Sequence, residues 1–494
     1  IFIIVIIALV IVGAILVFFL LVDTQKVRKP TGINIDVVNS YTKQYIDIAK
    51  DEGSSLEKFD SCSALEDTIK KAQENRPYGD SGIARSFEPL GVAEAGSAKS
   101  SLEYSRTNVQ VEGVDEADIV KTDGEFIYTL SRNNLVIARA YPEESAKIES
   151  QIDLKDFYPR EMFIDDERVL IFGESSRIIP LEQKIENIYP ASFPTTTLKI
   201  FDVSDKNEPK LVRGVDFEGY YITSRKISSQ VYFVLNNYPR YYPTIETIDI
   251  VPKFRDSALN NEFSPVVGCS SVRYFDPIVV ENFLTVAAIN MEDDDSDIEK
   301  EVILGSGENV YASLDNLYVA QTQYPYYYNV EPESSDIQVE TTYMHKFSLE
   351  DGSINYVGNG KVPGRILNQF SMDEYMDNFR IATTIGHVTR EGSFSENNIY
   401  VLDEDLNLIG SLEDLAPGEQ IYSARFIGDR AYLVTFKKID PFFVIDLSNP
   451  RNPKVLGKLK IPGYSDYLHP YDEDHIIGIG KEALDAEEGS FAWY

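Results

Sequence analysis

Residues that commonly carry redox and metal chemistry are scarce in this sequence. It contains two cysteines, four histidines and one tryptophan among 494 residues. The histidines are His345, His387, His469 and His475, and no two of them stand at a metal-ligand spacing such as His-x-x-x-His. The composition therefore gives no indication of a zinc or thiol-based active site, and the scarcity of cysteine agrees weakly with an exported protein.

Short catalytic and nucleotide-binding motifs are also missing. The sequence has no Gly-x-Ser-x-Gly, no Gly-x-Gly-x-x-Gly and no phosphate-binding loop that ends in Gly-Lys-Ser/Thr. Paired carboxylates are frequent, but such pairs arise by chance in so acidic a chain, so they give little support to a glycosidase. No organic cofactor is expected, and an enzyme is not the favoured interpretation.

Positive charge is sparse. The 46 Lys and Arg are outnumbered by 80 Asp and Glu, which leaves a formal net charge of −34. Nucleic-acid binding is excluded on this ground, because contacts to phosphates require a basic face. The acidity fits a soluble domain outside the cell, or one that collects cations.

One long apolar segment opens the chain. Residues 1–22 contain neither charge nor proline, and as a helix they would span about 33 Å, enough to cross a hydrocarbon core of about 30 Å. We expect an uncleaved membrane anchor, so that the membrane is one partner of the chain. Lys26, Arg28 and Lys29 would favour the cytoplasmic side for the residues after the anchor, whereas the acidity of the main domain favours the extracytoplasmic side.

The two cysteines stand far apart. Cys62 lies on the apolar side of a short helix expected within residues 41–75, and Cys269 precedes a strand. A disulfide between them would fix the helix to the main domain, and two separate buried thiols are the alternative. We expect three parts: the anchor at 1–22; a tether, short helix and linker at 23–106; and the main domain at 107–494.

From residue 107 onward the sequence changes to short strands with turns. One unit is a turn that carries Asp, Asn or Gly, followed by a strand that begins with a large apolar or aromatic residue. Seven copies occur, at residues 123–128, 166–171, 229–234, 315–319, 377–381, 428–433 and 473–477, and the copy at 229–234 has Ser-Gln in place of Asp, Asn or Gly. Each copy predicts a hairpin turn that leads into a buried strand.

A second unit follows several of these hairpins. It is a strand that ends in Asp-x-Ser before a turn with Pro, clear at residues 201–210 and 445–454 and weaker at 347–350 and 401–403. The two units together give four strands per repeat, which predicts an all-β fold: a β-propeller of about seven four-stranded blades. The last repeat is incomplete at Tyr494, so we expect the chain to continue.

Several longer stretches carry a family resemblance. They include the opening motif at 107–130, which contains Val-Glu-Gly-Val-Asp-Glu-Ala-Asp, and the stretches 252–257, 269–274, 416–426, 440–448 and 467–472. Together they resemble the secreted archaeal and bacterial β-propeller family that is distantly related to WD40 repeats. The resemblance implies an exported propeller, often anchored at its N-terminus. It implies no established biochemical activity.

Three groups of polar residues are candidate sites. Five could face the central channel of a propeller, or instead form a hydrogen-bonded network that fixes the blades: Glu419, Arg425, Asp440, His469 and Asp472. An acidic run could bind Ca²⁺, or be a solvated loop: Asp293, Asp294, Asp295 and Asp297. Asp115, Glu116 and Asp118 of the opening motif could likewise bind a cation or serve as strand-end hydrogen-bonding groups.

Two loops rich in tyrosine and proline are the candidate binding surface. Their tyrosines are Tyr238, Tyr241, Tyr242, Tyr324, Tyr326, Tyr327 and Tyr328, and tyrosine is enriched at recognition surfaces. Loops that pack on their own rings are the alternative. We therefore predict a protein-binding or glycan-binding scaffold at the cell surface. The alternatives are an extracytoplasmic hydrolase or metal-dependent enzyme with its site in the central channel, and a subunit of an envelope assembly or filament.

Overall fold

A computed structural model gives the architecture of most of the main domain. It describes residues 57–74, 109–155, 157–179, 191–238, 250–274, 282–324, 340–387, 394–436, 440–461, 463–472 and 475–482. The predicted anchor at residues 1–22 lies outside these ranges. Within them, no helix combines the length and the apolar character needed to cross a membrane.

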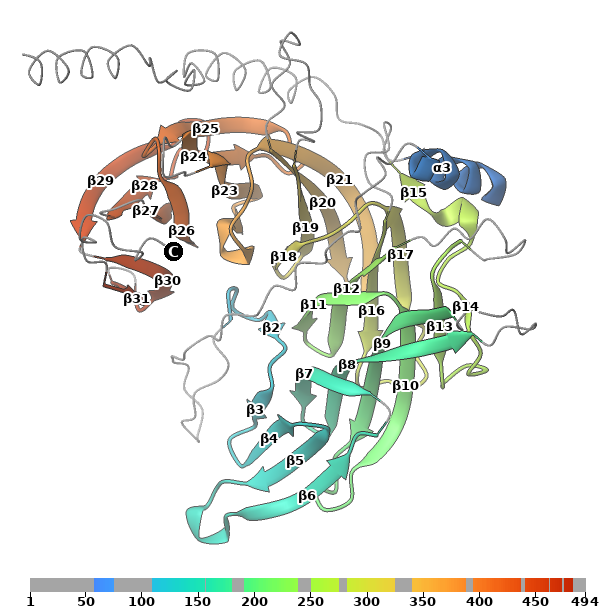
Figure 1. Cartoon of the computed structure of the whole chain (residues 1–494). Coiled ribbons are helices and arrows are strands. Elements are labelled where there is room, and N and C mark those ends of the chain that lie inside the picture. Colours follow the sequence, from blue (N-terminus) through green and yellow to red (C-terminus); the bar gives the residue numbers. More distant parts are fainter. Residues whose placement is uncertain are drawn as a thin grey trace, which may run out of the picture.

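Antiparallel sheets follow one another around a common centre (Figure 1). We number them as blades 1 to 7 in chain order. Their strands are, for blade 1, β3 (Val120–Thr122), β4 (Phe126–Ser131), β5 (Asn134–Arg139) and β6 (Lys147–Asp153); for blade 2, β7 (Tyr158–Asp165), β8 (Arg168–Ile179), β9 (Ala191–Asp202) and β10 (Lys210–Glu218); for blade 3, β11 (Tyr220–Ile227), β12 (Gln230–Asn237), β16 (Phe283–Asn290) and β17 (Glu299–Leu304).

The remaining blades follow the same order. They are, for blade 4, β18 (Asn309–Ala312), β19 (Asn316–Gln323), β20 (Thr341–Glu350) and β21 (Ser353–Pro363); for blade 5, β22 (Met372–Tyr375), β23 (Asn378–His387), β24 (Phe394–Leu402) and β25 (Leu408–Leu415); for blade 6, β26 (Gln420–Ile427), β27 (Arg430–Phe436), β28 (Asp440–Asp446) and β29 (Lys454–Ile461); and for blade 7, β30 (Tyr464–Pro470) and β31 (Ile476–Lys481). The all-β propeller prediction is confirmed, and blade 7 shows two strands within the described residues.

All seven predicted hairpins join the first strand of a blade to its second. The first of them shows why the signal is local. Asp123 Oδ1 accepts hydrogen bonds from the backbone N–H groups of Glu125 at 3.0 Å and Phe126 at 2.7 Å, and Gly124 adopts a φ of 94° that suits glycine. The turn is therefore encoded by adjacent residues.

The Asp-x-Ser units join third strands to fourth strands. Asp202 Oδ1 accepts from the backbone N–H of Ser204 at 2.9 Å, and Asp446 Oδ1 does the same from Ser448 at 2.9 Å. Hydrogen bonds from the side chains of Ser204 and Ser448, together with these backbone bonds, stabilise the charged carboxylates and lower the pKa of both aspartates. Both kinds of short turn thus lie on one face of the propeller, the tight-turn face, and the links from second to third strands leave from the opposite, long-loop face.

Blades 2 and 3 exceed the four strands that the repeat predicts. The link between β12 and β16 adds β13 (Lys253–Asp256) and β14 (Ser264–Pro265) to blade 2, so that this sheet has six strands. It then returns through β15 (Arg273–Tyr274), which pairs in parallel with β17. Blade 3 gains β15, β1 (Glu57–Lys58) and β2 (Asp115–Glu116) and has seven strands.

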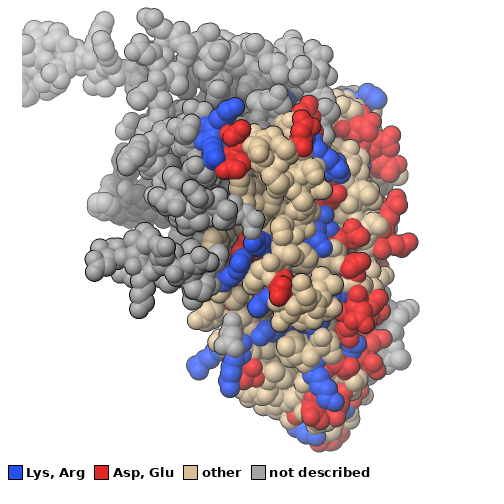
Figure 2. All heavy atoms as spheres, turned by 90° about the vertical axis from the view of Figure 1, so that its right-hand side faces the viewer, with Lys and Arg blue, Asp and Glu red and all other residues tan. Residues whose placement is uncertain are grey.

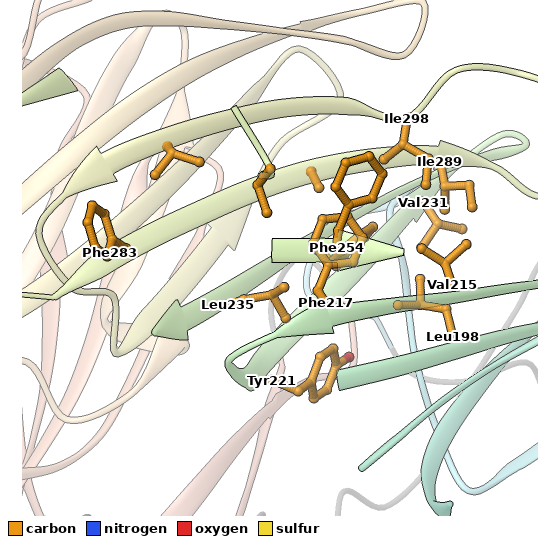
Figure 3. Packing of buried hydrophobic residues seen from close by; sticks show 14 of the residues in the cluster. Leu198, Val215, Phe217, Tyr221, Val231, Leu235, Phe254, Phe283, Ile289 and Ile298 are labelled. Carbon is orange, nitrogen blue, oxygen red and sulfur yellow. The ribbon is translucent and has the colours of Figure 1, made fainter. Parts of the chain in front are cut away.

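An aromatic core lies between these two enlarged blades (Figure 3). Phe217 of β10 stacks on Phe254 of β13 with ring centroids 5.4 Å apart, and it meets Phe233 of β12 edge to face at 5.4 Å. All three side chains are buried. Such pairs contribute about 0.5–1.5 kcal/mol each beyond the burial of area, so blades 2 and 3 form one packed unit.

The helix α3 (Cys62–Glu74) is joined to this unit covalently. Cys62 and Cys269 form a disulfide with their Cα atoms 5.0 Å apart, so the two residues are not separate thiols. Leu65 and Ile69 of the helix are buried in the core of blades 2 and 3. Part of the segment expected as tether and linker is therefore packed against the propeller.

The disulfide should contribute measurably to stability. The double variant Cys62→Ser with Cys269→Ser is expected to lose about 2–4 kcal/mol of unfolding free energy, because the bridge restricts the unfolded chain across a separation of 207 residues. Urea unfolding of the oxidised proteins measures this difference. Wild type unfolded under reducing conditions is the control and should match the variant; equal midpoints for oxidised wild type and variant would contradict the expectation.

Candidate functional site at the centre of the propeller

The opening motif crosses the centre of the propeller. In this motif, β2 lies beside β11, the first strand of blade 3 (Figure 1). The two strands pair antiparallel, and Glu116 lies opposite Arg225. Asp118 then exchanges backbone hydrogen bonds with Met162 of β7, the first strand of blade 2, at 3.2 and 2.8 Å. The chain continues directly into β3, so the motif links blades 1, 2 and 3.

The same segment reaches blade 5. Gln110 Nε2 donates to the backbone carbonyls of Gln369 at 3.2 Å and Met372 at 3.0 Å. Val114 is buried against the core shared by blades 3 and 4. We call residues 109–118 the central strap, because they contact first strands from several blades.

The acids of the central strap face cations of the protein itself. Lys121 Nζ lies 2.8 Å from Asp115 Oδ1, and only 4% of the lysine side chain is exposed. Glu116 Oε1 lies 4.0 Å from Nε of Arg225, and Asp118 Oδ1 accepts from the backbone N–H of Ile119. These contacts match the strand-end alternative, not a cation site.

Blade 5 contributes a further ion pair, which also contacts blade 6. Arg380 Nε donates to Asp373 Oδ2 at 2.9 Å, and Arg380 Nη1 donates to the carbonyl of Gly428 at 2.6 Å. Burial raises the pKa of Asp373, although the positive charge of Arg380 acts in the opposite direction. The pair joins the first two strands of blade 5, and the bond from Arg380 to Gly428 links the second strand of blade 5 to the hairpin of blade 6.

Arg425 of β26 belongs to an aromatic cluster. Its guanidinium lies over the ring of Phe370 at 4.8 Å, and Phe370 meets Tyr467 edge to face at 5.7 Å. The hydroxyl of Tyr467 is 3.3 Å from Nδ1 of His469, which is buried. Two of the five predicted channel residues, Arg425 and His469, are thus brought into one cluster.

The other three predicted channel residues lie elsewhere. Glu419 Oε2 accepts from Thr435 Oγ1 at 2.6 Å near the long-loop end of blade 6. Asp440 begins β28, the third strand of its blade. Asp472 accepts from the backbone N–H of His475 at 2.8 Å in an exposed turn. The structure therefore brings two of the five residues together and places the other three on different strands or turns, which closeness in sequence does not reveal.

The acidic run forms links between blades. Asp294 Oδ2 lies 3.1 Å from Arg168 Nη2, and the carbonyl of Ser296 accepts from Arg213 Nη2 at 2.8 Å. Arg213 in turn pairs with Asp256 at 2.6 Å, each with 1% of its side chain exposed.

The carboxylates of that run do not converge. Over the described ranges, no three or more His, Cys, Asp or Glu side chains gather as a metal site would require. Asp293, Asp295 and Asp297 are exposed, while Asp294 turns toward an arginine. The Ca²⁺ prediction for these four residues therefore gains no support from the geometry.

Two of the predicted tyrosines can be placed. Tyr238 follows β12 and meets Tyr220 edge to face at 5.8 Å, and Tyr324 follows β19; all three are exposed. Because Tyr238 and Tyr324 follow second strands, both leave from the long-loop face, on neighbouring blades 3 and 4. The predictions for Tyr241, Tyr242, Tyr326, Tyr327 and Tyr328 fall outside the described residues.

Comparison with known proteins identifies the family. The family model described as "Beta propeller domain" matches residues 104–491. The chain belongs to this β-propeller domain family. The resemblance inferred from the opening motif is therefore confirmed.

Two archaeal relatives of the β-propeller domain are similar over most of their length. An uncharacterized protein of Methanocaldococcus jannaschii is 31% identical over 85% of this chain and 72% of its own length. An uncharacterized protein of Archaeoglobus fulgidus is 29% identical over 77% of this chain and 67% of its own length. A solved apocarotenoid oxygenase mutant from Synechocystis covers 73% of each chain at 10% identity, but its TM-score of 0.31 carries no argument.

Sequence reasoning missed a polar pair in the centre of the β-propeller domain. Tyr221 donates a hydrogen bond to Glu161, and its oxygen lies 2.6 Å from Ser224 Oγ. Burial raises the pKa of Glu161, against the opposing effects of the Tyr221 hydrogen bond and of Arg225 and Arg160. Polar residues inside otherwise apolar strands are the signal that could have revealed this pair.

The buried pair of Arg213 and Asp256 should be sensitive to the loss of one partner. Asp256→Asn is expected to cost about 3–5 kcal/mol of unfolding free energy, since it leaves a buried guanidinium uncompensated. The control Asp294→Asn breaks a partly exposed pair and should cost about 1 kcal/mol or less. Chemical denaturation of wild type and the two variants measures these effects. Equal losses of unfolding free energy in both variants would contradict the expectation that the buried pair is more sensitive.

The raised pKa of Glu161 predicts a pH dependence. Below the ordinary glutamate pKa of about 4.3, wild type and Glu161→Gln should be similarly stable, because the carboxyl is protonated in both folded and unfolded wild type. As the pH rises, ionisation of Glu161 favours the unfolded state of the wild type. The variant should therefore become more stable relative to wild type until the pH exceeds the raised pKa of Glu161 in the folded protein. Unfolding midpoints measured between pH 4 and 8 test this, and a difference that shrinks with rising pH would contradict it.

Proposed function

We propose that the chain is a membrane-anchored, extracytoplasmic β-propeller that binds a protein or a glycan at the cell surface. The propeller is the part that the family match establishes. The location and the binding role rest on three features: the apolar segment at residues 1–22, the disulfide, and the exposed tyrosines of the long-loop face.

The disulfide supports a location outside the reducing cytosol. Disulfides persist in oxidising compartments and are rare in most cytosolic proteins, although the cytosol of some hyperthermophiles retains them. The acidic surface agrees with this location. Figure 2 shows Asp and Glu gathered along one margin of the visible face, with Lys and Arg scattered over the rest. The bridge and the apolar segment together therefore favour export over a cytosolic role.

The observation that carries the binding role is the placement of Tyr238 and Tyr324. Neighbouring blades present them on the same face, and Tyr220 adds a ring beside Tyr238. Tyrosine supplies contact area at a low cost in conformational entropy, and a rigid scaffold with variable loops is a common way to build a recognition surface. Protein and glycan partners both use such aromatic surfaces.

The location can be tested directly. Protease added to intact cells that carry the full chain should remove the propeller, because an extracytoplasmic domain is accessible from outside. Alkylation of thiols in living cells before lysis should leave Cys62 and Cys269 unmodified, since both are oxidised. A propeller that survives until the cells are lysed would contradict the proposed orientation.

The binding surface can be tested by capture from solubilised native envelopes. A triple variant should capture the partner of the wild type, or bind an immobilised glycan, at least tenfold less well than wild type does. Its substitutions are Tyr220→Ser, Tyr238→Ser and Tyr324→Ser. Tyr471→Ser is the matched control, because Tyr471 is 66% exposed but lies in the hairpin of blade 7 on the tight-turn face. Equal capture by wild type and by the triple variant would exclude this surface.

A further inference from the structure

One buried cation at the centre of the propeller lacks a counter-ion. Arg425 is 5% exposed, and its Nη1 atom is buried without a hydrogen-bond partner. Across the described part of the chain, its guanidinium takes part in no hydrogen bond and no ion pair, and it lies over the ring of Phe370 at 4.8 Å. Buried arginines are normally paired, so this side chain requires an explanation.

Neighbouring carboxylates already have partners of their own. Glu116 faces Arg225, and Asp373 is held by Arg380. Both acids are close enough to raise the pKa of Arg425, yet burial outweighs them and lowers it. Of these three arginines, Arg225 and Arg380 have ion pairs within the described residues, and Arg425 has none.

The free donors of Arg425 define the ligand chemistry. Phe370 covers one face of the guanidinium, which leaves the edge that carries the N–H groups available. A planar guanidinium edge binds carboxylate and phosphate oxygens through paired N–H donors. A single anionic group at this edge would satisfy both the charge and the unpartnered Nη1 atom.

We propose that Arg425 binds an oxyanion, the carboxylate or phosphate group of a small ligand, at the centre of the propeller. This site is separate from the tyrosine surface, and it assigns the centre a ligand that the proposed scaffold role does not include. Tyr467 and His469 belong to the same cluster: Tyr467 meets Phe370 edge to face, acts electrostatically on Arg425, and has its hydroxyl 3.3 Å from Nδ1 of His469. The central strap supplies Glu116, whose pairing with Arg225 keeps it from neutralising Arg425.

Calorimetric titration of the full chain in non-ionic detergent tests the proposal. Acetate and succinate form the carboxylate arm, inorganic phosphate forms the phosphate arm, and chloride at matched ionic strength is the reference. We expect a ligand from one of the two arms, a carboxylate or phosphate, to bind the protein with a stoichiometry of one. Arg425→Met should weaken that affinity at least tenfold, whereas Arg430→Gln, which removes a largely exposed charge from the same hairpin, should leave it unchanged.

A second variant protects the test against misfolding. Arg425→Lys keeps the charge but loses the planar pair of donors, so it should also bind at least several-fold more weakly than wild type. Unfolding without ligand gives an independent readout: Arg425→Met should be at least as stable as wild type, because it removes an unpaired buried charge. The proposal is overturned if wild type binds none of the carboxylates or phosphate, or if both Arg425 variants bind them as tightly as wild type does.

Discussion

The pairing of β2 with β11 is the interaction on which the centre of the propeller depends. A four-stranded blade cannot cover both of its faces, so each blade relies on its neighbours, and first strands must be held at the right distance from the axis. The central strap does this through three contacts. It adds a strand to blade 3, forms backbone hydrogen bonds with Met162 in blade 2, and donates a side-chain hydrogen bond to Gln369, which precedes the first strand of blade 5. Its charged groups are matched by Lys121 and Arg225, which allows a polar segment to lie in the interior.

The repeat pattern was sufficient to predict the blades, because its signals are local. A turn such as that at Asp123 is made by residues within three positions of each other, so all seven hairpins could be read from sequence. The additions to blades 2 and 3 could not, since β13 and β15 pair with strands that the four-strand repeat does not provide for them. The candidate site shows the same limit: Arg425 and His469 meet through Phe370, a residue about 50 to 100 positions away from either.

The two faces and the centre of the molecule have different chemistry. Short turns closed by aspartate make up the tight-turn face. The long-loop face presents Tyr238 and Tyr324, which suits recognition of a large partner. In the centre, buried ion pairs restrict the first strands and leave Arg425 as the unmatched charge. A centre held by buried ion pairs and a face that presents exposed tyrosines are compatible with the binding platform that we propose.

Hydrogen–deuterium exchange of the central strap tests this account most directly. If β2 is an integral strand of blade 3, the amides of residues 114–118 should exchange as slowly as those of β11, and far more slowly than those of the exposed turn before His475. Exchange of residues 114–118 at the rate of that turn would show that the opening motif does not hold the centre, and the account would fail.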